Sequence, residues 1–511
     1  MTELFIDGNN LTIEDVYNIS AGGMTVKLTG DACRRVDRAR ALVERYVDEN
    51  RVEYGITTGF GRFADVNISK DETAQLQYNL IRSHACGVGE PLPIETARAV
   101  MLLRANALAK GYSGIRLSTL NTLVEMLDKD VIPVIPSKGS LGASGDLAPL
   151  AHMALVLIGE GEACYKGKRM PGKEAMGLAG ITPVRLDSKE GLALINGTPV
   201  MTAIGALTVC GAINLIKAAD IAGAVSMEAL RGIRDAFDDR VQMLRPHAGQ
   251  TATARNINRL TEGSSLVTGQ GQLRMQDSYT IRCIPQVHGA SKDALNYVKG
   301  TIETELNSVT DNPLIFPDDD AVISGGNFHG QPIALAMDFL GIAVSEIADI
   351  SERRTAKLID SNLNNGLPCF LTKEGGLNSG FMIPQYAAAA LVSENKVLAH
   401  PASVDSIPSS ANQEDHVSMG TIAARKAKEI LNNSIDVVAI ELMTACQAVD
   451  LRDEGHPGKG TSAAYKVIRT AAPFIAKDEY MHGYIENCAG LVAGGQIIKA
   501  VESEIGPLDL S

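Results

Sequence analysis

The residues best suited to unusual chemistry form one short run, Ala143-Ser144-Gly145, with Gly142 before it and Asp146 after it. Small residues leave the backbone bare, so the Gly145 nitrogen can approach the Ala143 carbonyl. Ser144 carries a hydroxyl that can leave as water. Cyclisation and dehydration would give a five-membered ring with an exocyclic methylidene, an electrophile that no ordinary side chain supplies. Taken alone, such a run is more often an ordinary turn before a helix, so its surroundings decide between the two.

A longer segment around this run carries a signature. Residues 139–150 read Gly-Ser-Leu-Gly-Ala-Ser-Gly-Asp-Leu-Ala-Pro-Leu, which resembles the motif of the aromatic amino-acid ammonia-lyases. The resemblance extends from about Tyr54 to Asp450. It implies that the Ala-Ser-Gly run matures into a methylidene-imidazolone (MIO) group, with its first and third residues cross-linked and Ser144 as dehydroalanine, so that no external cofactor is needed. Asp146 is placed to cap the following helix or to face its positive end.

Elimination of ammonia also needs a base, because the β-hydrogen of an amino acid is weakly acidic. The resemblance supplies two candidates, Tyr54 on a glycine-containing loop at 51–61 and Tyr279. A tyrosine acts as a base only where positive neighbours or helix dipoles pull its pKa well below about 10. Without the resemblance, the loop at 51–61 is equally an ordinary surface loop anchored by one aromatic residue. The sequence leaves open which tyrosine is the base.

Other segments offer groups that would hold the substrate. By the resemblance, Arg282 binds the substrate carboxylate through its planar guanidinium. Asn196 donates a hydrogen bond to the MIO oxygen or binds the carboxylate. Gln276 and Phe328 match further pocket positions, and Phe328 is placed to pack on an aromatic substrate ring. Pro199 follows Asn196-Gly-Thr where the family more often has glutamine.

Two residues bear on substrate choice, His84 and Glu414. A carboxylate at position 414 would accept a hydrogen bond from an imidazole N–H, whereas against a phenyl ring it would be desolvated without a partner. Phenylalanine-selective family members have an apolar pair at Ser83-His84, but tyrosine-acting members can keep the histidine. Glu414 therefore favours histidine as the substrate. The alternative is a relative that acts on tyrosine, either as a lyase or as a 2,3-aminomutase.

Long helices must position these residues. Five segments rich in Ala, Leu and Ile have helical periodicity, at 203–230, 290–306, 332–358, 384–400 and 417–449. Their succession indicates a bundle rather than alternating strands and helices. A small β-hairpin around acidic residues is expected at 312–324. The expected fold is mainly α, with a long central helical bundle and a smaller N-terminal region that carries the Ala-Ser-Gly turn and the active-site loops.

The pattern divides the chain into an N-terminal region at 1–187, a central bundle at 188–453 and a C-terminal helical extension at 454–511. Of the 511 residues, 45% are hydrophobic but only 4% are aromatic, which suits closely packed helices. The formal net charge of −13 argues against nucleic acid as the main partner. Eight scattered cysteines without a Cys-x-x-Cys motif indicate reduced thiols and a cytoplasmic location.

Two other interpretations are weaker. The uncharged segment 191–216 is long enough to span a bilayer, but its Asn, Pro and Gly residues favour a loop and a buried helix, so no membrane is expected. Glu414, Asp415 and His416 offer metal ligands, but consecutive residues point in different directions and no His-Glu-x-x-His spacing occurs, so no metal is expected. The resemblance implies a small amino-acid substrate and a homotetramer whose active sites draw residues from several chains.

Overall fold

The computed structural model describes residues 2–59, 61–63, 66 and 68–511, which fall into two compact units. The first unit comprises Met1–Leu207, Lys299–Met337 and Pro401–Arg425, and the second comprises Thr208–Val298, Asp338–His400 and Lys426–Ser511. Both units are discontinuous in sequence, whereas the three ranges expected from the sequence are contiguous. Those expected boundaries stay a prediction.

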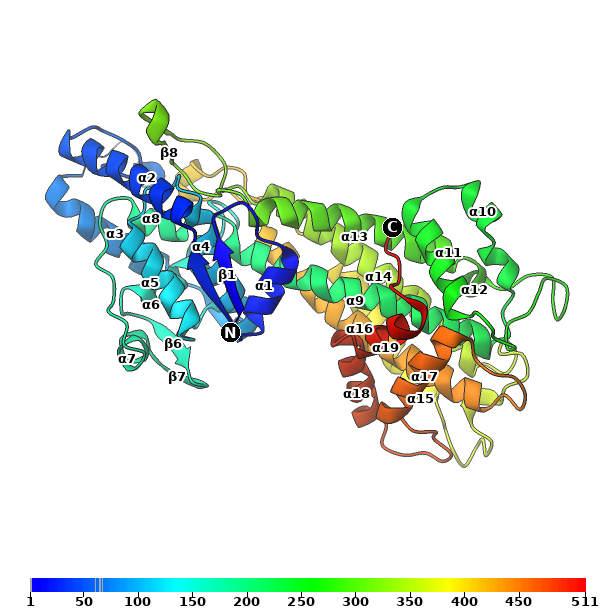
Figure 1. Ribbon diagram of the computed structural model, residues 1–511. Coiled ribbons are helices and arrows are strands. Elements are labelled where there is room, and N and C mark those ends of the chain that lie inside the picture. Colours follow the sequence, from blue (N-terminus) through cyan, green and yellow to red (C-terminus); the bar gives the residue numbers. More distant parts are fainter. Residues whose placement is uncertain (1, 60, 64–65, 67) are drawn as a thin grey trace. The chain divides into compact units, whose positions relative to one another are not determined.

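The described chain is mainly helical, as expected (Figure 1). The helices before the middle of the chain are α1 (Ile13–Ser20), α2 (Gly30–Asp48), α3 (Lys70–His84), α4 (Ile94–Ala109), α5 (Leu117–Asp128), α6 (Leu147–Leu157), α7 (Gly172–Leu178), α8 (Glu190–Ile195) and α9 (Pro199–Ala229). Those that follow are α10 (Asp239–Met243), α11 (Ala248–Leu260), α12 (Tyr279–Arg282), α13 (Ile284–Leu306), α14 (Gln331–Ile359), α15 (Met382–Leu398), α16 (Gly420–Asp450), α17 (Lys459–Ala471), α18 (His482–Ala493) and α19 (Gln496–Ile505). The five expected long helices are α9, α13, α14, α15 and α16, so the helical fold class is confirmed.

Strands are few and short, and in the described chain they form four small sheets. The first is a parallel pair, β1 (Thr2–Ile6) and β2 (Met24–Leu28). The others are antiparallel: β3 (Val88–Pro91) with β5 (Pro136–Lys138), β4 (Ile132–Pro133) with β6 (Glu162–Tyr165) and β7 (Lys168–Pro171), and β8 (Leu314–Phe316) with β9 (Ala321–Ile323). The pair β8–β9 is the expected hairpin, with Leu314 opposite Ile323.

Helix α9 begins beside the candidate site and is unusually apolar. Pro199 is its first residue, a position where the missing N–H has no intrahelical partner to lose and the fixed φ suits the helix. Among the described residues it is the one helix long and apolar enough to cross a bilayer, yet 72% of its most apolar window is buried in the protein. This burial is typical of a core helix.

Candidate active site

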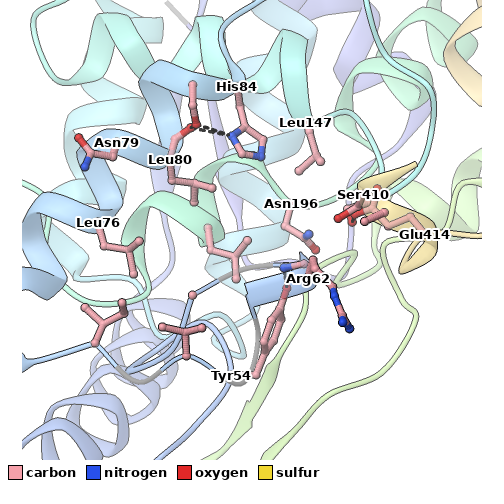
Figure 2. A pocket seen from close by; sticks show the side chains of 18 residues that line it. Tyr54, Arg62, Leu76, Asn79, Leu80, His84, Leu147, Asn196, Ser410 and Glu414 are labelled. Atoms are coloured by element: carbon pink, nitrogen blue, oxygen red, sulfur yellow. Dashed lines mark hydrogen bonds between the residues drawn. The ribbon is translucent and has the colours of Figure 1, made fainter. Parts of the chain in front are cut away.

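A cavity of about 720 Å³ lies in the first unit, where five separate segments meet (Figure 2). They contribute Tyr54 from its loop, His84 from the end of α3, Ser144 from the Ala-Ser-Gly turn, Asn196 from the end of α8, and Glu414 from the loop before α16. The fold therefore brings together five of the residues that the sequence predicted for the site.

Apolar side chains that the sequence had not indicated also line this cavity. They are Val66, Ile68, Leu76, Leu80, Leu147 and Leu192, and Figure 2 shows Leu76 on the side away from Glu414. A signal for two of them was present, because Leu76, Leu80 and His84 are spaced four residues apart and share one face of α3. The cavity thus offers one apolar wall and one wall with a carboxylate.

The Ala-Ser-Gly turn is held against the segment that follows α8. The Asp146 nitrogen donates to the Gly197 carbonyl at 2.6 Å, and the Gly197 nitrogen donates to the Ser144 carbonyl at 3.3 Å. Gly145 has a φ of +74°, and a Cβ on it would lie 2.0 Å from the Gly197 oxygen. Only glycine fits this close backbone approach.

The Asp146 carboxylate does not cap α6, which it precedes and which the sequence suggested as its target. Its Oδ2 instead accepts hydrogen bonds from the backbone nitrogens of Val200 and Met201, both at 2.9 Å, at the start of α9. Its Oδ1 accepts from the hydroxyls of Ser140 and Thr421. Burial raises the pKa of Asp146, although these hydrogen bonds oppose the shift. One carboxylate therefore ties the turn to α9 and to α16.

Glu414 is fixed by a strained turn. Its Oε1 accepts a hydrogen bond from the Ser144 hydroxyl at 3.1 Å, and its Oε2 accepts one from the Ser409 hydroxyl at 3.0 Å. Three consecutive non-glycine residues between Ser409 and Glu414 have left-handed φ angles: Ser410, Ala411 and Asn412. Such angles are unfavourable for residues with a Cβ and persist where the surroundings enforce them. The enforced turn aims the carboxylate at Ser144.

His84 lines the cavity in a defined tautomer. Its Nδ1 lies 2.8 Å from the Leu80 carbonyl oxygen (Figure 2), and because a carbonyl only accepts, Nδ1 carries the proton. Nε2 is then an acceptor. Burial lowers the pKa of His84, while the Leu80 hydrogen bond and the charge of Glu414 oppose the shift. A neutral imidazole is therefore the favoured form.

Tyr54 lies at the cavity with its hydroxyl oxygen accepting a long hydrogen bond, 3.4 Å, from the Gly61 nitrogen. Burial raises the pKa of Tyr54, and the charge of Glu414 raises it further. The neighbours in this chain therefore do not provide the lowered pKa that a tyrosine base requires. Phe60, in the same loop, lies outside the described residues.

Three predicted site residues lie in the second unit and do not line this cavity: Gln276, Tyr279 and Arg282. The guanidinium carbon of Arg282 is 4.6 Å from the centroid of the Tyr279 ring, and its Nε donates to the Asp277 carbonyl at 2.9 Å. Phe328, half-buried in the first unit, is also not a lining residue. Within the described part of the chain, no group of three or more His, Cys, Asp or Glu side chains could hold a metal ion.

The chain is similar in sequence and in fold to known proteins. The chain is 64% identical over 505 residues to a histidine ammonia-lyase of Alkaliphilus oremlandii, with 99% of each chain covered. The crystal structure of histidine ammonia-lyase from Trypanosoma cruzi matches with a TM-score of 0.92 at 42% identity, covering 99% of this chain and 96% of that one. Tyrosine aminomutase from Streptomyces globisporus matches with a TM-score of 0.95 at 37% identity, covering 99% of this chain and 100% of that one.

The long-helix fold is thus shared with enzymes that process amino acids. The sequence model of the aromatic amino acid lyase family matches residues 11–470 of this chain. The chain belongs to the aromatic amino acid lyase family, and the enzyme class expected from the sequence is confirmed.

Proposed function

We propose that this chain is a histidine ammonia-lyase, which eliminates ammonia from L-histidine without oxidation and releases trans-urocanate, the first step of histidine degradation. The observation that carries the proposal is the Glu414 carboxylate, which lines the cavity and lies 3.1 Å from the Ser144 hydroxyl. A substrate held at Ser144 therefore has a hydrogen-bond acceptor for an imidazole N–H close by. The histidine ammonia-lyases among its relatives, at 53–64% identity, support the same substrate.

The Ala-Ser-Gly turn fits the MIO group that this activity requires. Gly145 is buried, and its backbone nitrogen donates no hydrogen bond to any described residue, so it is available to attack the Ala143 carbonyl. The left-handed φ of Gly145 bends the chain back at this point. Ser144 faces the cavity, where its methylidene would meet a substrate. When formed, the group supplies an electrophilic carbon that binds the substrate amine.

The residues around the turn then have distinct tasks. Glu414 and the Nε2 atom of His84 are two acceptors that bind and orient the imidazole ring, and the apolar wall of the cavity excludes water. The Oδ1 atom of Asn196 is buried without a partner among the described residues. We assign the Asn196 side chain either to donating a hydrogen bond to the MIO oxygen or to binding the substrate carboxylate. We assign removal of the proton at the substrate β-carbon to Tyr54 or Tyr279. We assign binding of the substrate carboxylate to Arg282.

These assignments require an assembly of chains. Gln276, Tyr279, Arg282 and Phe328 do not line the cavity of their own chain, so we propose a homotetramer in which they complete the sites of other chains. In the single chain, Gln276 and Tyr279 are exposed, Tyr279 by 69%, which is compatible with that role. No disulfide joins the eight cysteines in the part of the chain that the structure describes, and the location that we propose is the cytoplasm.

The test is to incubate the protein separately with histidine, tyrosine and phenylalanine. Product formation is measured by the ultraviolet absorbance of the conjugated acrylate. Glu414→Gln and Glu414→Ala should cut turnover of histidine sharply, because the imidazole loses a charged acceptor. Asp415→Asn is the matched control, because Asp415 is exposed and next in sequence. Wild-type rates in both Glu414 variants, or a preference of the native enzyme for tyrosine, would overturn the histidine assignment.

The similarity to a tyrosine aminomutase structure favours a second candidate function. A tyrosine ammonia-lyase would release a hydroxylated acrylate from tyrosine, and a tyrosine 2,3-aminomutase would return the ammonia to the β-carbon. Chromatography of the products from tyrosine separates these outcomes, because only the mutase yields a β-amino acid.

A further inference from the structure

Arg104, on α4, is fully buried in the first unit behind the candidate site. Its Nη1 donates a hydrogen bond to the carbonyl oxygen of Asn196. Its Nε and Nη2 have no acceptor among the described residues. The one hydrogen bond that this guanidinium makes is therefore directed at the backbone of the segment that holds the Ala-Ser-Gly turn.

The surroundings leave this positive charge incompletely neutralised. The nearby carboxylate of Asp311 is already bonded by Lys189, whose Nζ lies 3.0 Å from Oδ2, and by the Asn312 nitrogen at 2.7 Å from Oδ1. Arg104, Lys189 and Asp311 are all buried, so two basic side chains share one carboxylate. Burial lowers the pKa of Arg104, and Asp311 opposes the shift, but a guanidinium stays protonated in proteins.

A single peptide group connects Arg104 to the turn. The Asn196 carbonyl that accepts from Arg104 and the Gly197 N–H belong to the same peptide bond. That N–H donates to the Ser144 carbonyl oxygen at 3.3 Å. Hydrogen bonds in a chain polarise one another, most strongly in a buried setting. A cation on the Asn196 oxygen therefore makes the Gly197 N–H a stronger donor to Ser144.

Negative charge develops on the carbonyl oxygen of Ser144 in two steps of this chemistry. The Gly145 nitrogen is conjugated with the Ser144 carbonyl, so loss of the Gly145 amide proton during cyclisation places charge on that oxygen. After dehydration, a nucleophile that bonds to the methylidene carbon of Ser144 displaces the C=C electron pair toward the same oxygen, and a proton from solvent completes the addition. A donor aimed at this oxygen favours both steps.

We propose that Arg104 is a positioning residue that polarises the Asn196–Gly197 peptide, so that the Gly197 N–H stabilises negative charge on the Ser144 oxygen. Arg104 thereby increases the reactivity of the methylidene carbon toward nucleophiles without contacting the substrate. This role rests on the proposed MIO chemistry and extends it to a residue outside the cavity. A purely structural Arg104 would affect the stability of the fold and leave the reactivity of Ser144 unchanged.

Arg40 provides the matched control for substitutions at Arg104. It is also buried in the first unit, and its Nη1 donates to the backbone oxygens of Ser188 at 2.8 Å and Gly114 at 3.3 Å. Among the described residues, its side chain forms no hydrogen bond or ion pair with Ser144 or Asn196. Arg104→Met and Arg104→Lys are therefore compared with Arg40→Met and Arg40→Lys.

The experiment measures three quantities on each full-length variant. Mass spectrometry of the peptide with residues 143–145 gives the fraction that has lost two waters. The absorbance change on adding cyanide gives the rate of addition to the matured fraction without substrate. Steady-state assays on histidine give kcat and KM separately.

For Arg104→Met we expect slower loss of water and cyanide addition slowed about tenfold or more relative to Arg40→Met, with kcat reduced and KM little changed. Arg104→Lys should restore part of the addition rate, because the charge is retained; if Arg104→Met does not fold, the two lysine variants decide. Equal maturation and equal addition rates in the Arg104 and Arg40 variants would overturn the role of Arg104. A wild-type peptide of unmodified mass in active enzyme would instead overturn the proposed function itself.

Discussion

The Ser144 hydroxyl donates a hydrogen bond to Glu414, and Ser144 lines the cavity. The proposed conversion of residues 143–145 into an MIO group predicts a specific change of mass at this residue. The wild-type peptide with residues 143–145 should be lighter than its sequence mass by two waters. Ser144→Ala should abolish nearly all turnover while the helical circular dichroism stays unchanged, because only a hydroxyl is removed. An intact, unmodified peptide in active wild-type enzyme would contradict the mechanism.

The hydroxyl of Tyr54 is the second single group whose removal tests the mechanism, here the proton transfer. Tyr54→Phe removes one oxygen whose protein hydrogen bond is long, 3.4 Å, so the fold should survive. Turnover should fall by about a hundredfold or more, the usual effect of losing an acid–base group. The measurement is kcat on histidine, with Tyr78→Phe on α3 as the control, because Tyr78 does not line the cavity. Near-normal turnover would make Tyr54 a packing residue.

At the scale of elements, the turn depends on its close contact with the segment before α16. Gly142 has a φ of +75°, and a Cβ on it would lie 2.3 Å from the Ser418 Oγ. Gly142→Ala should therefore separate the turn from this segment, lower the free energy of unfolding by about 1–3 kcal/mol and reduce maturation at Ser144.

Gly167→Ala is the control for that substitution. Gly167 has nearly the same φ, +73°, but a Cβ on it would meet nothing within 4 Å. It therefore reports the backbone strain alone, while Gly142→Ala reports strain and steric contact together. Equal thermal midpoints and equal peptide masses for the two variants would show that the contact with Ser418 is unimportant.

The helices could be predicted from the sequence because their apolar residues recur at helical spacing over many turns. The prediction at 417–449 differs from α16, Gly420–Asp450, by only a few residues at its ends. The hairpin β8–β9 was predictable as well, because acidic turn residues separate two short apolar runs. Local patterns suffice where the signal for an element lies within the element.

The arrangement of the site could not be predicted in the same way. The Asp146 carboxylate caps α9, which begins more than fifty residues later, and no local pattern signals that partner. Ser410, Ala411 and Asn412 adopt left-handed angles without a glycine to indicate them. Arg104 lies in an apolar helical run, where its hydrogen bond to Asn196 depends on tertiary packing.

At the scale of the whole molecule, stability should depend on pH through a buried carboxylate far from the site in sequence. Glu228, near the end of α9, is completely buried, and its Oε1 accepts a hydrogen bond from the Gly458 nitrogen at 2.7 Å, at the start of α17. Burial raises the pKa of Glu228 from 4.5 to about 7, although the Gly458 hydrogen bond and the nearby His456 oppose the shift. The folded protein therefore retains a proton that the unfolded chain releases.

The sign of the pH dependence follows from this difference. Between the unfolded pKa, 4.5, and the folded pKa, about 7, the folded state binds more protons, so its stability falls as pH rises through this window and is constant above it. The full difference corresponds to about 3 kcal/mol of unfolding free energy. Glu228→Gln keeps an acceptor for Gly458 but has no charge. It should match the wild type in thermal midpoint at pH 5 and exceed it at pH 8, whereas Glu504→Gln, at an exposed position on α19, should change neither. A Glu228→Gln variant that is less stable than the wild type at pH 8 would show that the ionised carboxylate stabilises the start of α17 by more than its burial opposes it.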